Sequence, residues 1–222
     1  MTAVNPVHTV MAPRMIQSTV SMGTGYRRHW SMELAPDTRV AVLVEGTSDK
    51  VAVEALAARL EIPLDGVTVV ALGGVTNIGN FLTLFRGFDL TYAGLCDAGE
   101  ERYFLRALER AGLGKDLNRE RMRELGFFVC EPDLEGELIR ALGIPGVEAV
   151  VDSLGDLNDL RVFQNQPYHR SRPPEDQLHR FMGTMSGRKA KYARALVAAL
   201  DLDRVPEPLR LLLAYMDEHR HP

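Results

Sequence analysis

The sequence predicts a parallel α/β domain over residues 37–142, followed by a helical C-terminal appendage over residues 143–222. Short apolar runs alternate in this region with stretches in which apolar residues recur every three or four positions. Such short runs are typical of strands covered on both faces. Regular alternation of strand and helix implies right-handed crossovers. We therefore expect a four-stranded parallel sheet flanked by helices.

Each expected strand is a short run rich in apolar residues, and each is followed by an expected helix. The expected strands are residues 39–44, 67–71, 91–96 and 127–130. The expected helices are residues 53–60, 78–85, 100–111 and 134–142. Ser48 follows the first strand and can cap the helix that comes after it. The order along the chain is therefore strand then helix, four times.

The two ends of the chain lack this regularity. Residues 1–36 show no sustained periodicity and contain turn formers, so we expect a disordered N-terminal extension. Residues 161–176 contain three prolines and are predicted to be loop-like. Two further helices are expected, one after Ser186 to about residue 200 and one around residues 209–216. The appendage has no strand pattern.

The net charge of −4 conceals an asymmetry along the chain. Residues 37–160 hold 12 lysines and arginines against 22 aspartates and glutamates, whereas residues 161–222 hold 11 against 7. An acidic core beside a basic tail suits a metal site flanked by a phosphate-binding surface. No apolar run approaches the roughly 18–20 residues that span a bilayer, and no signal pattern opens the chain. We therefore expect a cytoplasmic protein without a membrane partner.

Acidic residues gather at the carboxyl ends of the expected strands, where open parallel sheets bind ligands. They are Glu45, Asp49, Asp97, Glu100, Asp133 and Glu135. Several carboxylates in one crevice repel one another unless a cation is present. Oxygen ligands favour Mg²⁺ or Mn²⁺ over zinc. The alternative is that some of these acids only complement the dipoles of the helices that they precede.

Other kinds of catalytic site find little support. No G-x-G-x-x-G motif follows the first strand, and no G-x-x-x-x-G-K-[ST] motif is present, so the chain is not a P-loop ATPase. The six histidines all lie outside residues 37–142 and form no H-E-x-x-H motif. Ser48 has no plausible histidine partner for a hydrolase triad.

The basic residues of the appendage interleave with aromatic ones. The candidates for nucleic-acid contacts are Arg170, Arg172, Arg188, Lys191 and Arg194. Contacts of these side chains with backbone phosphates would position a nucleic acid without reading its sequence. The alternative is a solvated helix face with Tyr192 on the buried side.

The motif Val44-Glu45-Gly46-Thr47-Ser48-Asp49 resembles the V-E-G-x-S-D opening of TOPRIM domains, which are Rossmann-like. The spacing onward to Leu72-Gly73-Gly74, Leu95-Cys96-Asp97 and Asp133-Leu134-Glu135 is most similar to the OLD (overcoming lysogenization defect) nucleases. The resemblance covers roughly residues 39–142 and extends to Gly187-Arg188-Lys189. It marks Gly46, Gly73 and Gly74 as structural glycines.

The resemblance implies a role for each matching residue. Glu45 would be a general acid/base or a metal ligand, Asp97 a Mg²⁺ ligand and Asp49 a supporting acid. Glu135, with Asp133, would complete a second metal position, and Lys189 would contact the scissile phosphate. The implied activity is Mg²⁺- or Mn²⁺-dependent phosphodiester cleavage by an endonuclease-like hydrolase. The implied partners are nucleic acid, with DNA ahead of RNA, an ATPase acting in trans, and a second copy of the chain.

Two departures from the family pattern leave alternatives open. The family has D-x-D after the third strand, whereas this chain has Asp97-Ala98-Gly99-Glu100. Glu100 would reach the metal from one position further on, or a helical turn would aim it away. OLD nucleases also join the TOPRIM domain to an ATPase, whereas we expect this chain to be a stand-alone TOPRIM protein. A weakened module that binds nucleic acid or a partner ATPase is the second reading, and chemistry on a small phosphorylated substrate is the third.

Overall fold

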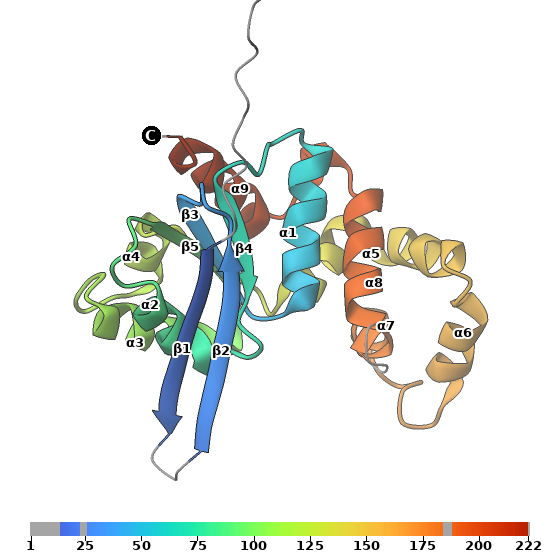
Figure 1. The fold of residues 1–222 in the computed structure, drawn as a ribbon. Coiled ribbons are helices and arrows are strands. Elements are labelled where there is room, and N and C mark those ends of the chain that lie inside the picture. Colours follow the sequence, from blue (N-terminus) through green and yellow to red (C-terminus); the bar gives the residue numbers. More distant parts are fainter. Residues whose placement is uncertain (1–13, 23–25, 184–187, 222) are drawn as a thin grey trace, which may run out of the picture.

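The computed structural model describes residues 14–22, 26–183 and 188–221, and its centre is a four-stranded parallel sheet (Figure 1). The strands are β3 (Val40–Val44), β4 (Val67–Ala71), β5 (Thr91–Asp97) and β6 (Phe127–Cys130). Their order across the sheet is β4-β3-β5-β6, and every neighbouring pair is parallel. The predicted α/β class with a four-stranded parallel sheet is confirmed.

The central strand β3 is buried on both faces, as its unbroken apolar sequence predicts: all five of its residues are fully buried. Its register pairs Leu43 with Val70 of β4 and with Gly94 of β5. A Cβ atom on Gly94 would lie 2.4 Å from the Leu43 carbonyl oxygen. Glycine is therefore required there, because β3 and β5 approach too closely for a side chain.

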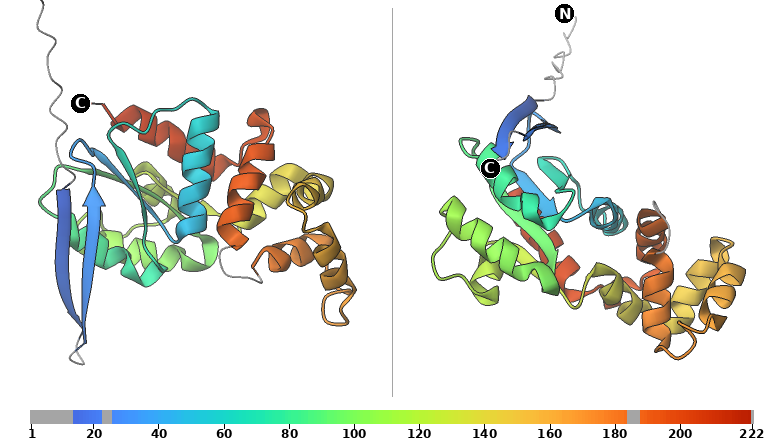
Figure 2. Two further views of the ribbon diagram at one scale, coloured as in Figure 1. Left: turned by 45° about the vertical axis from the view of Figure 1, so that its right-hand side comes forward. Right: turned by 90° about the horizontal axis from the view of Figure 1, so that it is seen from below.

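Helices cover both faces of the sheet (Figure 2). Their bounds are α1 (Thr47–Arg59), α2 (Ile78–Leu84), α3 (Glu101–Ala111), α4 (Arg119–Glu124), α5 (Leu134–Ser153), α6 (Leu157–Asn165), α7 (Pro174–Gly183), α8 (Arg188–Ala199) and α9 (Glu207–His219). Three short 3₁₀ turns are η1 (Val75–Asn77), η2 (Ala98–Glu100) and η3 (Leu202–Arg204). One core cluster joins the sheet to α2, α3 and α4, and the other joins it to α1 and to α5 through α9. No helix in the described part of the chain is long and apolar enough to cross a membrane.

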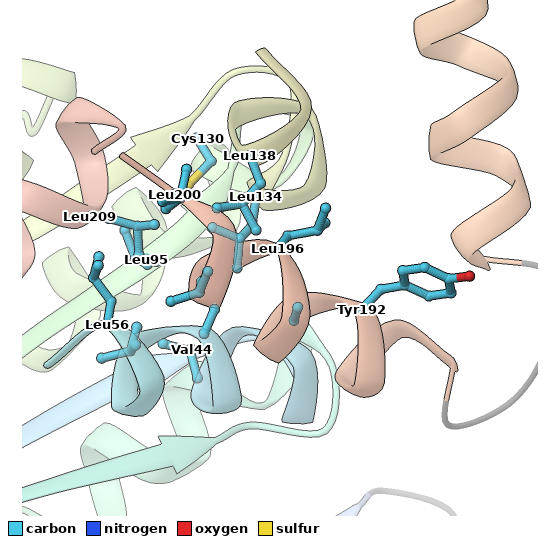
Figure 3. Packing of buried hydrophobic residues seen from close by; sticks show 14 of the residues in the cluster. Val44, Leu56, Leu95, Cys130, Leu134, Leu138, Tyr192, Leu196, Leu200 and Leu209 are labelled. Carbon is cyan, nitrogen blue, oxygen red and sulfur yellow. The ribbon is translucent and has the colours of Figure 1, made fainter. Parts of the chain in front are cut away.

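The C-terminal helices share the core of the sheet rather than forming a core of their own. Leu196 of α8 and Leu209 of α9 belong to the same buried cluster as Val44 and Leu95 of the sheet (Figure 3). The predicted boundary between residues 142 and 143 falls where α5 bends, because Gly143 has φ 69° and ψ 165°. The chain leaves the sheet through α6 and α7 and returns to it through α8 and α9.

The expectation that residues 161–176 are loop-like is wrong at both ends of that range. Residues 161–165 belong to helix α6, not to a loop, and α7 begins at Pro174. Leu160 and Phe163 provide the buried side of α6, a stripe too short to stand out beside the prolines. Proline at the start of α7 is compatible with helix formation, because the first helical N–H needs no partner.

The shared core leads to a stability prediction. Leu212 on α9 is fully buried in the cluster that contains the sheet. Leu212→Ala should lower the free energy of unfolding by about 2–5 kcal/mol, the usual cost of such a cavity. Urea unfolding followed by circular dichroism, and by hydrogen exchange of the backbone amides of β3 and β5, should give one coincident transition. Early loss of helical signal, with the sheet unfolding unchanged, would show that α9 folds apart from the sheet.

The expectation of disorder over residues 1–36 is wrong for β1 (Arg14–Met22) and β2 (Tyr26–Leu34). These strands form a two-stranded antiparallel sheet in which Ile16 pairs with Met32 and Val20 with Arg28. Figure 1 shows the hairpin beside the parallel sheet. Apolar residues at many of the even positions from 16 to 34 are the signal for this hairpin. Residues 1–13 and 23–25 lie outside the described part of the chain.

Candidate metal centre

The ends of β3 and β5 bring three carboxylates together, which we call the β3–β5 group. Glu45 follows β3, Asp97 ends β5, and Glu100 ends the 3₁₀ turn η2. One carboxylate oxygen from each lies within 4.8 Å of the others. The turn η2 directs Glu100 toward the strand ends, so Glu100 stands near Asp97 although Gly99 occupies the place of the second aspartate. Both alternatives for Glu100 were open from sequence, and the structure selects the inward one.

Burial and mutual repulsion raise the pKa values of two carboxyl groups in the β3–β5 group. Burial, followed by the charges of Asp49, Asp133 and other nearby acids, raises the pKa of Asp97 to about 8. Burial also raises the pKa of Glu100 to about 7, with a hydrogen bond to Glu45 and the charge of Glu45 adding to the effect. The Glu100 Oε2 atom is buried and has no hydrogen-bond partner among the described residues. Each of these features disfavours ionisation unless a cation is present.

Asp49 supports the β3–β5 group without joining it. Its Oδ2 accepts a 2.8 Å hydrogen bond from the N–H of Gly46, which caps α1. Burial raises the pKa of Asp49 to about 6 although this hydrogen bond opposes the shift. Its carboxylate is therefore engaged with the loop that carries Glu45, which agrees with a supporting rather than a ligating role.

The glycines after β4 hold the backbone of Glu45. The N–H groups of Gly73 and Gly74 lie 3.0 and 3.3 Å from the Glu45 carbonyl oxygen and donate to it. Gly73 has φ 67° and Gly74 has φ 119°, values that favour glycine. Gly46, by contrast, has an extended φ of −139°. The turn after β4 thus fixes the residue from which the Glu45 side chain projects.

A second group, which we call the α5–α7 group, comprises Asp133, Glu135 and His179. Asp133 caps α5: its Oδ1 accepts from the N–H of Gly136 at 2.8 Å, and its Oδ2 lies 2.7 Å from His179 Nε2. Burial acts to raise the pKa of Asp133, but these two hydrogen bonds outweigh it and lower the pKa. The carboxylate is therefore held in its charged form. Glu135 is 7% exposed, and it is the most buried member of the group.

His179 is a site residue that the sequence reasoning missed. It lies 46 positions from Asp133 and reaches it from α7, part of which was expected to be a loop. Its hydrogen bond to Asp133 raises the pKa of the imidazole in spite of partial burial. His179 lies one helical turn after exposed Glu175, on the same face of α7, so the helical pattern gave no sign of an inward side chain.

Lys189 lies at the start of α8 and brings a cation to the α5–α7 group. Its Nζ is 3.2 Å from Glu135 Oε1, and its side chain is 53% exposed. Burial acts to lower the pKa of Lys189, but the charges of Glu135, Asp133 and Asp49 outweigh it and raise the pKa. The ammonium group is thus charged, held beside a buried acid and still accessible from solvent.

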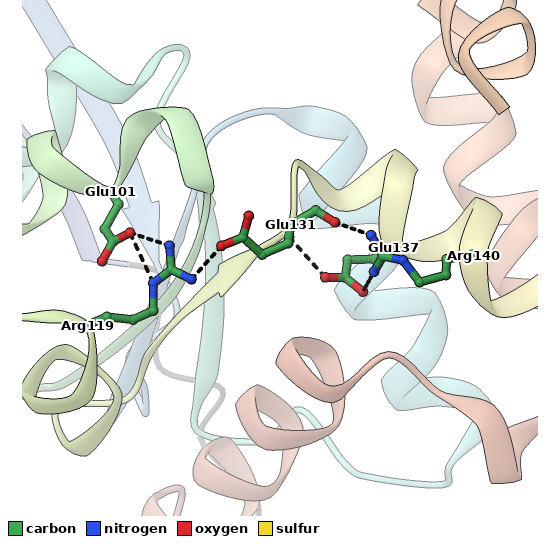
Figure 4. A network of polar contacts seen from close by, with 5 residues as sticks. All are labelled: Glu101, Arg119, Glu131, Glu137 and Arg140. Atoms are coloured by element: carbon green, nitrogen blue, oxygen red, sulfur yellow. Dashed lines mark hydrogen bonds and ion pairs between the residues drawn. The ribbon is translucent and has the colours of Figure 1, made fainter. Parts of the chain in front are cut away.

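A polar network ties the segments that carry the two groups (Figure 4). Arg119 contacts Glu101, which follows Glu100, and also Glu131, which closely precedes Asp133. Glu137 accepts from the N–H of Glu131 at 2.9 Å and from Arg140 at 2.8 Å. The network fixes the spacing between the end of η2 and the start of α5 from outside the site.

The predicted nucleic-acid contacts differ in exposure and in partners. The prediction that Arg188 contacts nucleic acid needs correction, because its side chain is only 9% exposed. The side chain lies over the Phe181 ring and pairs with Asp159 at 3.8 Å. Lys191 pairs with Asp156 at 3.3 Å but remains half exposed. Arg194 and Arg170 are exposed, and Arg172 lies over the ring of Tyr168. Ser186, after which the helix now seen as α8 was predicted to begin, lies outside the described residues.

The β3–β5 group has the donor set of a hard-cation site. It offers carboxylate oxygen only, one oxygen of Glu100 is buried and unsatisfied, and two of its members resist ionisation. Mg²⁺ and Mn²⁺ accept such ligands. The α5–α7 group adds two carboxylates and one imidazole nitrogen. Both groups could therefore hold a divalent ion.

The raised pKa values predict how the metal-free protein responds to pH. Between the ordinary acid values near 4 and the values of about 6 to 8 in the fold, the native state binds more protons than the unfolded state. Stability of the metal-free protein should therefore fall as pH rises from 5 to 8. Thermal unfolding in EDTA and in Mg²⁺ measures this, with the larger Mg²⁺ effect at pH 8. A metal-free protein equally stable at both pH values would contradict the assignment.

The fold and the site together define a class. A parallel α/β sheet that presents an acid after the first strand, another after the third and an Asp-x-Glu pair after the fourth is the arrangement of a TOPRIM domain. Residues 38–98 match the family model of the overcoming lysogenization defect protein-like TOPRIM domain. No curated protein matches the chain.

Solved structures of OLD proteins share this fold over most of the chain. The C-terminal region of the Burkholderia pseudomallei OLD protein is 23% identical with a TM-score of 0.64, covering 83% of this chain and 99% of that one. The C-terminal region of the Xanthomonas campestris pv. campestris OLD protein is 27% identical with a TM-score of 0.64, covering 82% and 96%. The chain therefore carries a TOPRIM domain that resembles the TOPRIM domain of OLD proteins.

Proposed function

We propose that the protein is a nuclease that uses Mg²⁺ or Mn²⁺ to cleave phosphodiester bonds, with DNA as the preferred substrate. One observation carries the proposal: Glu100 joins Glu45 and Asp97 within 4.8 Å and so supplies a third carboxylate to the β3–β5 group. The arrangement lies in a TOPRIM domain of the OLD type, which supports the same reaction class.

Each group has a distinct part in the proposed reaction. Glu45, Asp97 and Glu100 would hold one divalent ion, and Asp133 with Glu135 would hold a second. When bound, a pair of such ions polarises the phosphate and stabilises charge on the attacking and leaving oxygens. His179 is a positioning residue, because its hydrogen bond fixes the Asp133 carboxylate. Asp49 keeps the Glu45 loop in place through Gly46.

Lys189 would bind the scissile phosphate. Its ammonium group is charged, half exposed and 3.2 Å from the buried Glu135 carboxylate. A phosphate bound beside Glu135 would contact the ammonium group of Lys189, which is already positioned there. Arg170, Lys191 and Arg194 are exposed enough to contact flanking phosphates, and an ATPase acting in trans or a second copy of the chain would supply further surface.

A second candidate function is binding of nucleic acid without turnover. Gly99 in place of the second aspartate favours it, because Glu100 must then replace a ligand with a longer and less rigid side chain. Cleavage assays decide between the two functions.

The test compares three substrates with pure protein and either metal ion. Supercoiled plasmid, single-stranded RNA and a mononucleotide are incubated with Mg²⁺ or Mn²⁺, and with EDTA as the control. Nicked or linear plasmid that depends on the metal ion supports the proposal. Turnover of the mononucleotide alone would reassign the site to small phosphorylated substrates. Salt-sensitive binding of the polymers without any cleavage would favour the second candidate.

A further inference from the structure

A cavity of about 960 Å³ borders the α5–α7 group, and the reaction proposed above does not use it. Residues of α5, α6, α7 and the start of α8 line it. These helices lie on the side of the molecule away from the β1–β2 hairpin (Figure 2). His179 and Lys189 both line the cavity, and they contact Asp133 and Glu135 respectively. The cavity therefore opens directly beside the residues proposed to act on a phosphate.

The lining of the cavity combines charged and apolar side chains. Lys189 and exposed Arg140 and Arg180 bring positive charge to the lining, which suits an anion, while exposed Glu175 and Asp176 bring two negative charges to it. Ile144 and Phe163 are apolar, and the His169 ring stacks on Phe163 with centroids 3.8 Å apart. A ligand that matches both parts is flat and largely apolar at one end and carries an anionic group at the other.

We propose that this cavity receives an unpaired nucleotide of the substrate strand, with the base beside Ile144 and Phe163 and the phosphate at Lys189. The inference rests on the proposed nuclease function and assigns it a substrate class, namely nucleic acid with unpaired nucleotides. The volume lies within the range of natural ligand pockets, and aromatic and apolar walls accept any base. A base inside a duplex enters such a pocket only after leaving its stack, so paired substrates bind more weakly.

The first test fills the cavity and measures binding rather than activity. Ile144→Trp places a large side chain in the lining, whereas Val162→Trp makes the equivalent change at a site on α6 that is 59% exposed and outside the lining. Both are made in the Glu45→Ala background with Mg²⁺, so that cleavage is prevented. Fluorescence anisotropy then follows a labelled single-stranded DNA oligonucleotide and the matching blunt duplex.

The expected result is a selective loss. Ile144→Trp should weaken binding of the single strand about tenfold relative to Val162→Trp, and should change binding of the duplex less than about twofold. If each oligonucleotide bound Ile144→Trp and Val162→Trp with the same affinity, the inference would be overturned and the proposed function would stand. Absence of binding to either oligonucleotide in the Glu45→Ala background would overturn it too, and the plasmid assay would then judge the nuclease proposal separately.

A second pair of variants protects the test against misfolding of Ile144→Trp. Arg180→Glu reverses a charge at the exposed rim of the cavity, and Arg210→Glu reverses one on the exposed face of α9. Arg180→Glu should weaken single-strand binding about fivefold more than Arg210→Glu, because only Arg180 lies near the path of the strand. Equal effects of the two charge reversals would contradict the inference.

Discussion

Asp97→Asn is expected to abolish metal-dependent cleavage while making the metal-free protein more stable at pH 8. Asp97 is a proposed ligand, so its loss should reduce the rate by about 10²- to 10³-fold or more. The same carboxylate is crowded by other acids, and its pKa is raised to about 8 by burial and then by the charges of those acids. A neutral amide therefore removes a repulsion that only a bound cation would otherwise relieve.

Plasmid nicking and thermal unfolding in EDTA measure the two effects on the same preparation. Asp65→Asn is the matched control, because Asp65 is exposed in the loop before β4. The control should change neither the cleavage rate nor the unfolding temperature. If Asp97→Asn lost activity and stability together, Asp97 would be a structural residue and the proposed ligand role would be wrong.

Glu100→Ala is expected to reduce cleavage about a hundredfold, and adding Gly99→Asp is expected to restore most of that loss. Glu100 supplies the third carboxylate of the β3–β5 group from the last position of η2. Gly99 is exposed, and a Cβ atom there would meet no atom within 4 Å, so an aspartate fits without rearrangement. It would also recreate the D-x-D order that the resemblance leads one to expect.

Rates of nicking at saturating Mn²⁺ for wild type, Glu100→Ala and the double variant decide this prediction. Glu120→Ala, on the exposed side of α4, controls for loss of one negative charge. Full activity of Glu100→Ala would show that Glu100 is not needed. Loss in Glu100→Ala without any rescue by Gly99→Asp would mean that residue 99 does not face the site.

The fold and the strand-end acids were predictable because they depend on local sequence and one general rule. Unbroken apolar runs identify buried parallel strands, and parallel strands deliver the residues after them to one edge of the sheet. That is sufficient to bring Glu45 and Asp97 together. The same reasoning places Asp133 and Glu135 near the edge, since they follow the strand beside β5.

What escaped prediction depends on geometry between distant segments or on helical phase. The direction of Glu100 is set by η2, and sequence alone did not distinguish a 3₁₀ turn from the first turn of a helix. His179 reaches Asp133 only because α7 packs against α5. Arg188 was a reasonable phosphate contact by charge, but its position at the start of α8 turns it toward Phe181 and Asp159.

The most direct test of the metal-centre account is nicking of supercoiled plasmid by pure wild-type protein in Mn²⁺ or Mg²⁺, beside Glu45→Ala. Glu45 lies in the β3–β5 group within 4.8 Å of both Asp97 and Glu100, so the account predicts nicking by the wild type that disappears in EDTA and in the variant. Nicking of equal rate by Glu45→Ala, or no nicking by the wild type with either ion, would contradict it.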